Sequence, residues 1–372
     1  ETVSGIRENP HYLDVSMFNH ILSGRWKNMK IVVLAGGTST ERDVSIVSGT
    51  GICQALRQKG HQAILVDVFC GLEPVDWANP FPAKYDVEKA AEYIKSFNSQ
   101  MKELKKTRRD FFGPNVIELC KKADFVFLGL HGANGEDGKL QAAFDLMGIP
   151  YTGTGYLSSA MAMDKGVTKA MFQMRGVSTP GGKSMKKKDR QDSLAALGME
   201  FPVVVKTCCG GSSIGVYIVD DQEAYQKALD EAFEYENEVV VEEFIKGVEY
   251  TVAVVDGTAY PVVQIVPKEG FYDYENKYKP GAVQETCPAP ISEELTKRLQ
   301  EAAVDGYHAL EMESYARLDF IVTEDEKIYC LEANTLPGMT PTSLIPQEAA
   351  VLGMDYPTLC EELIRVSQKK YE

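Results

Sequence analysis

Tyr315-Ala-Arg-Leu-Asp-Phe-Ile-Val322, followed closely by Lys327-Ile-Tyr-Cys-Leu-Glu-Ala-Asn334, has the pattern of a β-hairpin. Side chains alternate between the two faces of a strand, so Arg317, Asp319 and Ile321 share one face and the other apolar residues share the opposite one. The hairpin therefore predicts a sheet with one buried face and one face that carries charged groups.

A turn centred on residues 325 and 326 places Arg317 opposite Asn334 and Asp319 opposite Glu332. Two carboxylates directly opposite each other repel. A divalent cation between them, with an amide oxygen from Asn334, removes that repulsion and offers the hard oxygen ligands that suit Mg²⁺. On the hairpin alone, an exposed face with a weak surface ion pair is the alternative interpretation.

The composition predicts a globular protein of more than one domain. At 372 residues the chain is long enough for two or three domains, since single domains run to about 100 to 200 residues. Its 44% hydrophobic and 25% charged residues are ordinary for a soluble protein. A net charge of −15 argues against a nucleic-acid partner. No apolar run approaches the ~18 residues of a membrane span, so we expect no membrane partner.

The eight cysteines have no CxxC spacing, which is typical of reduced thiols in a cytosolic protein and not of a disulfide framework or a zinc site. The first 28 residues lack the basic start and apolar core of a secretory signal. A strand-like segment begins at Met29, so we expect the preceding residues to be a separate extension of unknown role.

Strand and helix patterns alternate through the first part of the chain, as in a parallel α/β domain. Residues 30–37 and 61–69 predict strands, residues 44–59 predict the helix between them, and the polar stretch 73–109 predicts a solvated insertion. Later elements are expected as helices over 165–175, 222–233 and 292–310 and strands over 201–206, 215–219 and 238–245. The expected units are an extension (1–28), an N-terminal α/β domain (29–157), a central domain (158–246) and a C-terminal domain (247–372).

Two glycine-rich segments bear on nucleotide binding. Lys206-Thr-Cys-Cys-Gly-Gly-Ser-Ser-Ile-Gly215 offers backbone amides to phosphate oxygens, with a lysine at the end of the preceding strand. Strands are predicted on both sides and Gly-Lys-Ser/Thr is missing, so the segment is a hairpin tip and not a P-loop; a plain structural turn is the alternative. Gly36-Gly-Thr-Ser-Thr-Glu-Arg42 is not a GxGxxG fingerprint and gives a nicotinamide cofactor little support.

Several other candidate residues have a structural interpretation beside the ligand-binding one. Glu242 and Glu249 lie at strand ends, where they can accept hydrogen bonds from adenine or ribose or simply face solvent. The irregular aromatic stretch 271–278 favours a closing lid. His131, in a glycine loop after a strand, is a ligand-binding or a structural imidazole. Residues 334–344 can cradle a carboxylate or oxyanion with their amides and hydroxyls, or form only a tight turn.

Together these segments resemble the ATP-grasp ligases, and specifically the D-alanine–D-alanine ligase family, from about Met29 to the C-terminus. Each motif alone is modest evidence, whereas six in register are specific. They are Gly-Gly-Thr-Ser-Thr-Glu-Arg-Asp-Val-Ser, Leu-His-Gly-Ala-Asn-Gly-Glu-Asp-Gly, Gly-Ser-Ser-Ile-Gly, Tyr-Asp-Tyr-Glu-Asn-Lys-Tyr, Ala-Arg-Leu-Asp-Phe and Leu-Glu-Ala-Asn-Thr-Leu-Pro-Gly-Met-Thr.

The resemblance implies a three-domain ATP-grasp architecture with a nucleotide cleft between the central and C-terminal domains. It also implies ATP-dependent joining of two D-alanine molecules through an acyl phosphate, for peptidoglycan precursor synthesis, in a cytoplasmic homodimer. Two Mg²⁺ ions, with Mn²⁺ as a substitute, are implied at Asp319, Glu332 and Asn334.

The implied roles fall into two further groups. Among the implied catalytic residues, Glu41 holds the ammonium group of the first D-alanine, and Ser212 and Tyr278 hold the lid closed. Arg317 and the Gly338 amide stabilise the oxyanion. The implied substrate-binding residues are His131, Ser343 and Leu344. The ATP-binding residues are Lys165, Lys206, Ser213, Glu242, Glu243, Ile245, Glu249 and Lys277.

Two points stay open at this stage. A related ligase that uses D-serine or D-lactate as second substrate is the nearest alternative, although Lys277-Tyr278 favours the dipeptide enzyme; a nucleotide-binding regulator on the same scaffold is another. Cys208-Cys209 departs from the polar or charged residues that relatives often carry. Because the loop works through its backbone, we expect altered packing or oxidation sensitivity there and not a changed reaction.

Overall fold

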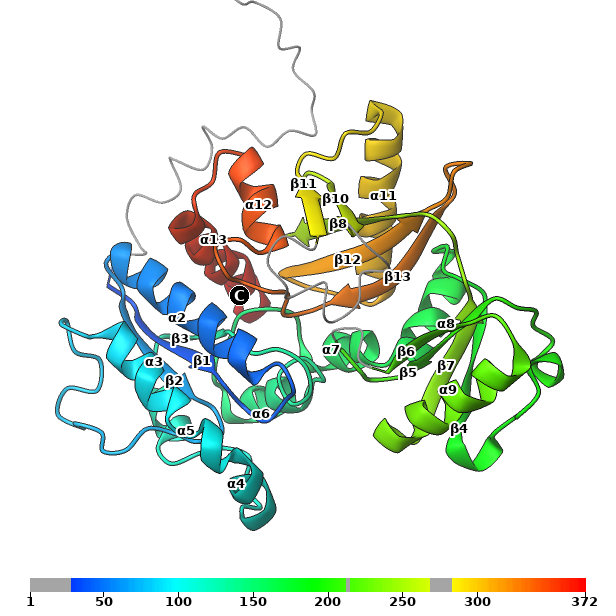
Figure 1. Ribbon diagram of the computed structural model, residues 1–372. Coiled ribbons are helices and arrows are strands. Elements are labelled where there is room, and N and C mark those ends of the chain that lie inside the picture. Colours follow the sequence, from blue (N-terminus) through cyan, green and yellow to red (C-terminus); the bar gives the residue numbers. More distant parts are fainter. Residues whose placement is uncertain (1–27, 212–214, 268–282) are drawn as a thin grey trace, which may run out of the picture.

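The structure is a computed structural model that describes residues 28–211, 215–267 and 283–372 (Figure 1). Three separate sheets organise this part of the chain, each with its own helices. Predictions for the extension 1–27, for Ser212 and Ser213, and for the lid with Lys277 and Tyr278 lie outside the described residues. Within the described ranges, no helix combines the length and the apolar character that crossing a membrane requires.

The N-terminal sheet is parallel, with the strand order β2-β1-β3. Alternate residues of its apolar strands face opposite cores, because helices cover both faces. Its elements are β1 (Lys30–Ala35), α2 (Arg42–Gln58), β2 (Gln62–Asp67), α3 (Val87–Lys95), η1 (Asn98–Gln100), α4 (Met101–Thr107), α5 (Val116–Lys122), β3 (Phe125–Leu128) and α6 (Lys139–Met147).

The stretch 73–109 is more than a solvated insertion, and that prediction was wrong in part. Phe81, Val87, Ala91, Ile94 and Met101 are buried and contribute to the cores on both faces of the N-terminal sheet. The helix α3 presents an apolar side to the sheet and its charged residues to solvent. Because residues 73–109 are polar on average, their composition did not reveal that one side of α3 is apolar.

The central sheet is antiparallel, with the order β4-β7-β5-β6, and α9 packs on one of its faces. Because β5 and β6 pair as a hairpin, the glycine-rich loop between them is a hairpin tip, as expected. The elements of this region are α7 (Tyr156–Met163), α8 (Lys165–Arg175), β4 (Gly182–Lys186), η2 (Lys187–Asp189), η3 (Leu194–Leu197), β5 (Val203–Thr207), β6 (Val216–Val219), α9 (Gln222–Tyr235) and β7 (Glu238–Glu243).

The C-terminal sheet has the order β11-β10-β8-β12-β13, with β9 beside β8. Leu318, Phe320 and Val322 of β12 pack with α11 on one face, which leaves Arg317 and Asp319 on the other. The elements here are β8 (Val248–Val255), β9 (Thr258–Ala259), β10 (Val263–Pro267), β11 (Val283–Thr286), α11 (Glu293–Ala309), β12 (Tyr315–Val322), β13 (Ile328–Asn334), α12 (Leu344–Val351), α13 (Tyr356–Gln368) and η4 (Lys369–Tyr371).

The predicted register of the β12–β13 hairpin is confirmed, because Arg317 pairs with Asn334 and Asp319 with Glu332. The register then shifts, so that Phe320 pairs with Cys330 and Leu331 is the additional residue of a β-bulge. Cys330 and Ala333 remain in the apolar core, whereas the adjacent residues Leu331 and Glu332 both line a cavity on the other face. The bulge thus directs two consecutive side chains to the same side.

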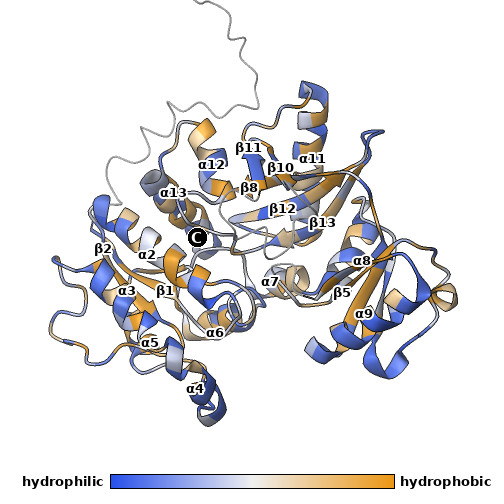
Figure 2. Cartoon of the chain, viewed as in Figure 1, coloured by the Kyte–Doolittle hydropathy of each residue, from blue (hydrophilic) through white to orange (hydrophobic). Residues whose placement is uncertain are grey.

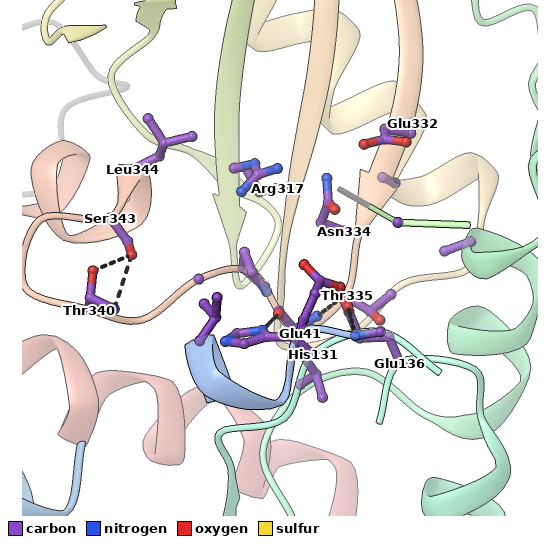
Figure 3. Close-up of a pocket in the computed structure, with 18 of the residues that line it drawn as sticks. Glu41, His131, Glu136, Arg317, Glu332, Asn334, Thr335, Thr340, Ser343 and Leu344 are labelled. Carbon is purple, nitrogen blue, oxygen red and sulfur yellow. Dashed lines mark hydrogen bonds between the residues drawn. The ribbon is translucent and has the colours of Figure 1, made fainter. Parts of the chain in front are cut away.

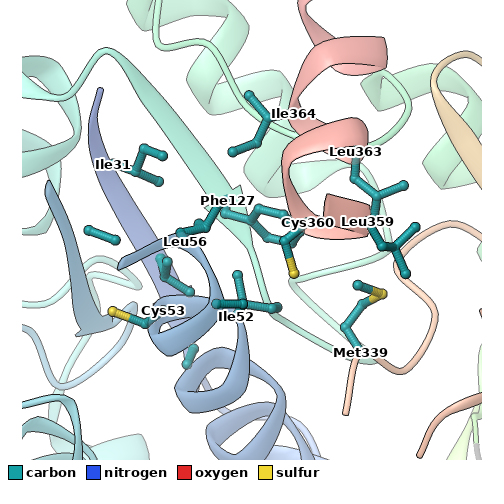
Figure 4. Packing of buried hydrophobic residues seen from close by; sticks show 14 of the residues in the cluster. Ile31, Ile52, Cys53, Leu56, Phe127, Met339, Leu359, Cys360, Leu363 and Ile364 are labelled. Carbon is teal, nitrogen blue, oxygen red and sulfur yellow. The ribbon is translucent and has the colours of Figure 1, made fainter. Parts of the chain in front are cut away.

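The N-terminal and C-terminal sheets share one hydrophobic core. Helix α13 packs against α2, and Leu359, Cys360 and Leu363 lie against Ile52 and the strands of the N-terminal sheet (Figure 4). Figure 2 shows hydrophobic residues along the strands and on the helix sides that face them. These two parts therefore form a joint platform, while the central sheet has a core of its own. The boundaries expected at 157/158 and 246/247 stay predictions.

Candidate active site

Two neighbouring cavities open between the sheets. One, of about 670 Å³, lies between the N-terminal and C-terminal sheets; we call it the acceptor cavity because it is lined by Glu41, Ser343 and Leu344, for which the resemblance implies contacts with the amino acids. The other, of about 610 Å³, lies between the central and C-terminal sheets; we call it the nucleotide cavity because it is lined by Lys206 and Glu249, for which the resemblance implies contacts with ATP. Lys165, Arg317 and Glu332 line both cavities. The charged face of the β12–β13 hairpin is therefore the place where the two cavities meet.

Asp319 is held rigidly on this face. Arg317 donates to both of its carboxylate oxygens, from Nε at 2.9 Å and from Nη2 at 2.8 Å. Asn334 Nδ2 donates to Oδ2 at 3.0 Å, and Thr251 Oγ1 donates to Oδ1 at 2.6 Å. Such a bidentate guanidinium–carboxylate pair fixes direction as well as charge. The repulsion expected between Asp319 and Glu332 is thus offset in this structure by Arg317 beside Asp319 and by Lys165 near Glu332.

Lys165 connects the hairpin to the glycine-rich loop. It is the first residue of α8, whose N-cap Asp164 accepts a hydrogen bond from the Val167 amide. The Lys165 Nζ atom donates to Gly210 O at 2.7 Å and lies 3.4 Å from Glu332 Oε2. A single ammonium group therefore lies between the loop and the acidic end of β13, at the junction of the two cavities.

The N-terminal wall of the acceptor cavity carries Glu41 and His131 (Figure 3). Glu41 is the N-cap residue of α2. His131 follows β3, and its ring atom Nδ1 lies 2.9 Å from Leu336 O, while Nε2 lies 3.0 Å from Ser48 Oγ. Since a carbonyl only accepts, Nδ1 carries the proton and Nε2 accepts from the serine hydroxyl. Burial lowers the pKa of His131, although the nearby Glu41 carboxylate acts to raise it. The lowered pKa agrees with the neutral form of the ring.

Glu136 belongs to the same wall, although its sequence context alone did not mark it as a site residue. Its Oε2 accepts from the Gly132 amide at 2.7 Å and its Oε1 from the Leu336 amide at 3.0 Å. The carboxylate thereby ties the His131 loop to the segment after β13. Burial, and then the nearby Glu41, raise the pKa of Glu136 to about 7. Its position five residues after His131, in a glycine-rich motif, was the available signal.

We expect Glu136→Gln to flatten the dependence of folding stability on pH between about 4.5 and 7. A carboxyl pKa that is raised in the folded state favours folding below the unfolded value of 4.5 and loses that contribution as pH rises to about 7. The loss amounts to roughly 1 to 3 kcal/mol, reduced because the side chain keeps some contact with the cavity. Urea unfolding of both proteins across this range measures it. Parallel stability curves would contradict the assignment.

The C-terminal wall of the acceptor cavity is the segment that leads into α12, where Ser343 is the N-cap residue and Leu344 begins the helix. Ser343 Oγ accepts from the Thr340 amide at 3.0 Å and lies 2.7 Å from Thr340 Oγ1. At Gly338 a Cβ atom would come within 3.1 Å of Ser343 Oγ, so a side chain would crowd this turn. The segment thus presents backbone and hydroxyl groups to the cavity, opposite Glu41 (Figure 3).

The nucleotide cavity is lined by all six of the predicted ATP-binding residues that the structure describes. Glu243 ends β7, Ile245 lies in the connection to β8, and Glu249 is the second residue of β8. Lys206 and Glu242 lie on the neighbouring strands β5 and β7 and form a nearly buried ion pair. The lining residues are Lys165, Lys206, Glu242, Glu243, Ile245 and Glu249, together with apolar side chains that include Val204, Ile265, Ile321 and Leu331.

The two cysteines of the glycine-rich loop differ in exposure, since Cys208 is buried and Cys209 is exposed. All the cysteines are free, as expected from their spacing. The protein atoms around the Cys209 sulfur partly desolvate it even though the residue as a whole is exposed, and this desolvation, followed by the nearby Glu236, raises the pKa of Cys209 to about 11. The expectation of altered packing or oxidation sensitivity in this loop stays a prediction.

The comparisons with known proteins place this geometry in a family. The family model described as "D-ala D-ala ligase N-terminus" matches residues 30–154, and the model described as "D-ala D-ala ligase C-terminus" matches residues 166–365. The chain belongs to the D-alanine–D-alanine ligase family. The resemblance stated from the motifs is confirmed, and with it the ATP-grasp fold and the enzyme class of an ADP-forming ligase.

Named relatives agree over nearly their whole length. A D-alanine–D-alanine ligase from Pediococcus pentosaceus is 41% identical over 350 residues, which cover 92% of this chain and 99% of the relative. The enzyme from Lacticaseibacillus casei is 40% identical over 361 residues, with 92% and 97% covered.

Solved structures of the family are similar in fold. A D-alanine–D-alanine ligase from Bacillus anthracis complexed with ATP has a TM-score of 0.71 at 31% identity, with 92% of this chain and 98% of that chain covered. The VanG D-Ala:D-Ser ligase from Enterococcus faecalis has a TM-score of 0.73 at 28% identity, with 92% and 100% covered. The family therefore includes structures whose names give different second substrates.

Proposed function

We propose that the two cavities form one active site, in which this ligase joins two D-alanine molecules at the expense of ATP. The observation that carries the proposal is the junction at Lys165, Arg317 and Glu332, which line both cavities. A nucleotide in one cavity and amino acids in the other would place the reacting phosphoryl and carboxylate groups against these charges. Phosphoryl transfer depends on such positioning and charge neutralisation and needs no nucleophilic side chain.

For the nucleotide, Glu242 and Glu249 accept hydrogen bonds from the adenine and the ribose, and backbone groups of Glu243 and Ile245 contact the base. Leu331, which the bulge turns into the cavity, adds an apolar contact for the ring. The ATP complex of the Bacillus anthracis relative supports a nucleotide site in this fold. Lys165 and Lys206, together with Ser213 and Lys277 outside the described residues, complete the proposed set for the phosphates.

Asp319, Glu332 and Asn334 would hold two Mg²⁺ ions, with Mn²⁺ as a substitute. The donor set fits, since two carboxylates and an amide offer hard oxygens on adjacent strands: Glu332 lines both cavities, Asp319 lines the nucleotide cavity and Asn334 lines the acceptor cavity. Among the described residues, no three His, Cys, Asp or Glu side chains lie together as a metal-binding group, so the proposed set relies on the Asn334 amide as its third ligand. When bound, the ions supply charge neutralisation for the phosphates.

For the amino acids, Glu41 binds the ammonium of the first D-alanine, with His131 beside it. The carboxylate of that molecule attacks the γ-phosphorus, and ADP leaves as the acyl phosphate forms. The amine of the second D-alanine, whose carboxylate lies on Ser343 and Leu344, then attacks the acyl carbon. Arg317 and the Gly338 amide stabilise the tetrahedral oxyanion until phosphate departs. Ser212 and Tyr278, outside the described residues, are proposed to hold the lid with Glu41.

The test is phosphate release with ATP and Mg²⁺ in the presence of D-alanine, L-alanine, D-serine or D-lactate. We expect D-alanine alone to support rapid release, with D-alanyl-D-alanine as product. Release that requires D-serine or D-lactate as second substrate would favour the alternative ligase, for which the structural similarity to the VanG enzyme is the relevant observation. Nucleotide binding without amino-acid-dependent release would indicate a regulator instead.

Tyr278→Phe is expected to increase the use of D-lactate as second substrate relative to D-alanine. The resemblance assigns this tyrosine to the lid, where relatives that make the ester tend to carry another residue. The measurement is coupled ADP release with each acceptor at equal concentration. An unchanged ratio of the two rates would count against the role of the tyrosine in acceptor choice.

The proposal extends to the location, the oligomeric state and the cellular role of the protein. We propose a cytoplasmic homodimer that supplies D-alanyl-D-alanine for peptidoglycan precursors, built from the three units 29–157, 158–246 and 247–372. The free cysteines and the acidic net charge of −15 agree with a reducing compartment and with small-molecule substrates. Sedimentation of the purified chain tests the dimer.

A further inference from the structure

A buried cluster of three charged residues lies behind the nucleotide cavity. Lys169 Nζ lies 2.6 Å from Glu242 Oε2, and Lys206 pairs with the other oxygen of the same carboxylate. The exposed fractions are 5% for Lys169, 8% for Lys206 and 3% for Glu242. Lys169 is one turn after Lys165 on α8, a spacing that places both on one side of the helix. Lys169 was not among the site residues predicted from the sequence.

The two lysines approach Glu242 from different sides. Lys206 and Glu242 line the nucleotide cavity, whereas Lys169 is not among its lining residues. Lys169 also donates to Pro180 O at 2.7 Å and to Thr179 Oγ1 at 3.1 Å, in the segment that leads into β4. Lys169 is therefore anchored in the protein, while Lys206 is the member of the pair that a ligand in the cavity can reach.

Two lysines share one buried carboxylate, so the cluster contains more basic than acidic groups. Burial lowers the pKa of Lys169, and the adjacent Glu242 opposes that shift. Burial acts to raise the pKa of Glu242, but Lys206 and then Lys169 outweigh it and lower that pKa. A buried carboxylate that loses a single counterion is strongly destabilised. If Lys206 were its only cationic partner, turning Lys206 toward a phosphate would leave the buried Glu242 carboxylate without a counterion, because the adenine proposed to donate to it is neutral. The second lysine removes that penalty.

We propose that Lys169 is a positioning residue that retains Glu242 and so allows Lys206 to bind the nucleotide phosphates. The inference rests on the proposed function, which places the phosphates beside Lys206. Lys169 itself touches neither nucleotide nor amino acid. Its effect is indirect: it sets how tightly Glu242 competes with a triphosphate for the Lys206 ammonium.

Lys169→Met is expected to weaken binding of a non-hydrolysable ATP analogue with Mg²⁺ by about tenfold or more, the size of a charge-assisted hydrogen bond. Calorimetry without amino acid measures the Kd. In steady state the KM for ATP should rise while the KM for D-alanine stays unchanged. Lys169→Arg, which keeps the cation, should restore most of the affinity. Lys186→Met is the matched control, since Lys186 is an exposed lysine that faces Glu238 across β4 and β7, and it should bind as the wild type does.

The decisive comparison repeats the substitution in a Glu242→Gln background. Without the carboxylate charge, residue 242 no longer competes with the phosphates for the Lys206 ammonium. Adding Lys169→Met in this background should therefore change the Kd by less than about twofold, because Lys169 and Lys206 are coupled through Glu242. Equal weakening in both backgrounds, or no weakening in either, overturns the inference. Should thermal unfolding show that Lys169→Met is unfolded, Lys169→Gln, whose amide still donates to Pro180, takes its place in the same comparison.

The outcomes separate the inference from the proposed function. A wild-type protein that binds the analogue but forms no D-alanyl-D-alanine contradicts the proposed function and leaves the comparison of Kd values valid. Conversely, a wild-type protein that makes the dipeptide, with a Kd insensitive to Lys169→Met, contradicts the inference alone.

Discussion

Glu332→Gln reduces D-alanine-dependent phosphate release by roughly 10³-fold or more, and the protein stays folded; this is the result that we expect. The substitution keeps the size of the side chain but removes the charge and one oxygen donor. Glu332 lines both cavities and lies 3.4 Å from Lys165, so its loss also leaves that ammonium without its carboxylate partner. Steady-state rates over a range of Mg²⁺ concentrations measure the effect.

A matched control is available on the same hairpin. Glu326 lies in the turn, where it pairs with Arg298 on the exposed surface, away from both cavities. Glu326→Gln should therefore keep normal rates and unfold at the wild-type temperature. Near-normal turnover of Glu332→Gln at ordinary Mg²⁺ would refute the metal assignment. A large fall in both variants would point to a damaged hairpin.

Arg317→Met should lower kcat/KM for D-alanine by roughly 10³-fold, because one side chain serves two purposes. It donates to both oxygens of Asp319, and it lines both cavities at the point where the oxyanion is proposed. Arg317→Lys should rescue little, since an ammonium cannot replace the planar, bidentate contact. Coupled ADP release measures the rates.

Arg298→Met is the corresponding control, because Arg298 is an exposed arginine that contacts the turn of the same hairpin. Thermal unfolding of all three variants separates lost chemistry from lost folding. If Arg317→Lys retained most of the activity, a point charge would suffice and the bidentate geometry would not matter. If Arg317→Met did so, the proposed oxyanion site would be wrong.

Local patterns predicted the elements that local forces determine. The helix over 165–175 was predicted with its correct bounds, because Asp164 provides an N-cap and Gly176 a left-handed end at φ of 77°. The pairing of Arg317 with Asn334 followed from strand alternation and the position of the turn. The bulge at Leu331 did not, since alternation carries no signal for an inserted residue.

Residues whose contacts are distant in sequence were the ones missed. Glu136 is defined by the Leu336 amide, 200 positions away, and Lys169 by Glu242 on another element. The composition of 73–109 concealed buried residues because only one side of α3 is apolar. Such features depend on tertiary packing, which a single sequence encodes only through the complete fold.

The shared core of α2 and α13 has a consequence for synthesis on the ribosome. Residues 30–154 leave the exit tunnel long before Leu359, Cys360 and Leu363 are translated, so the apolar side of α2 that packs against α13 stays uncovered on the nascent chain. A chain that stalls or is cleaved upstream of residue 356 keeps that surface open to chaperones and to aggregation.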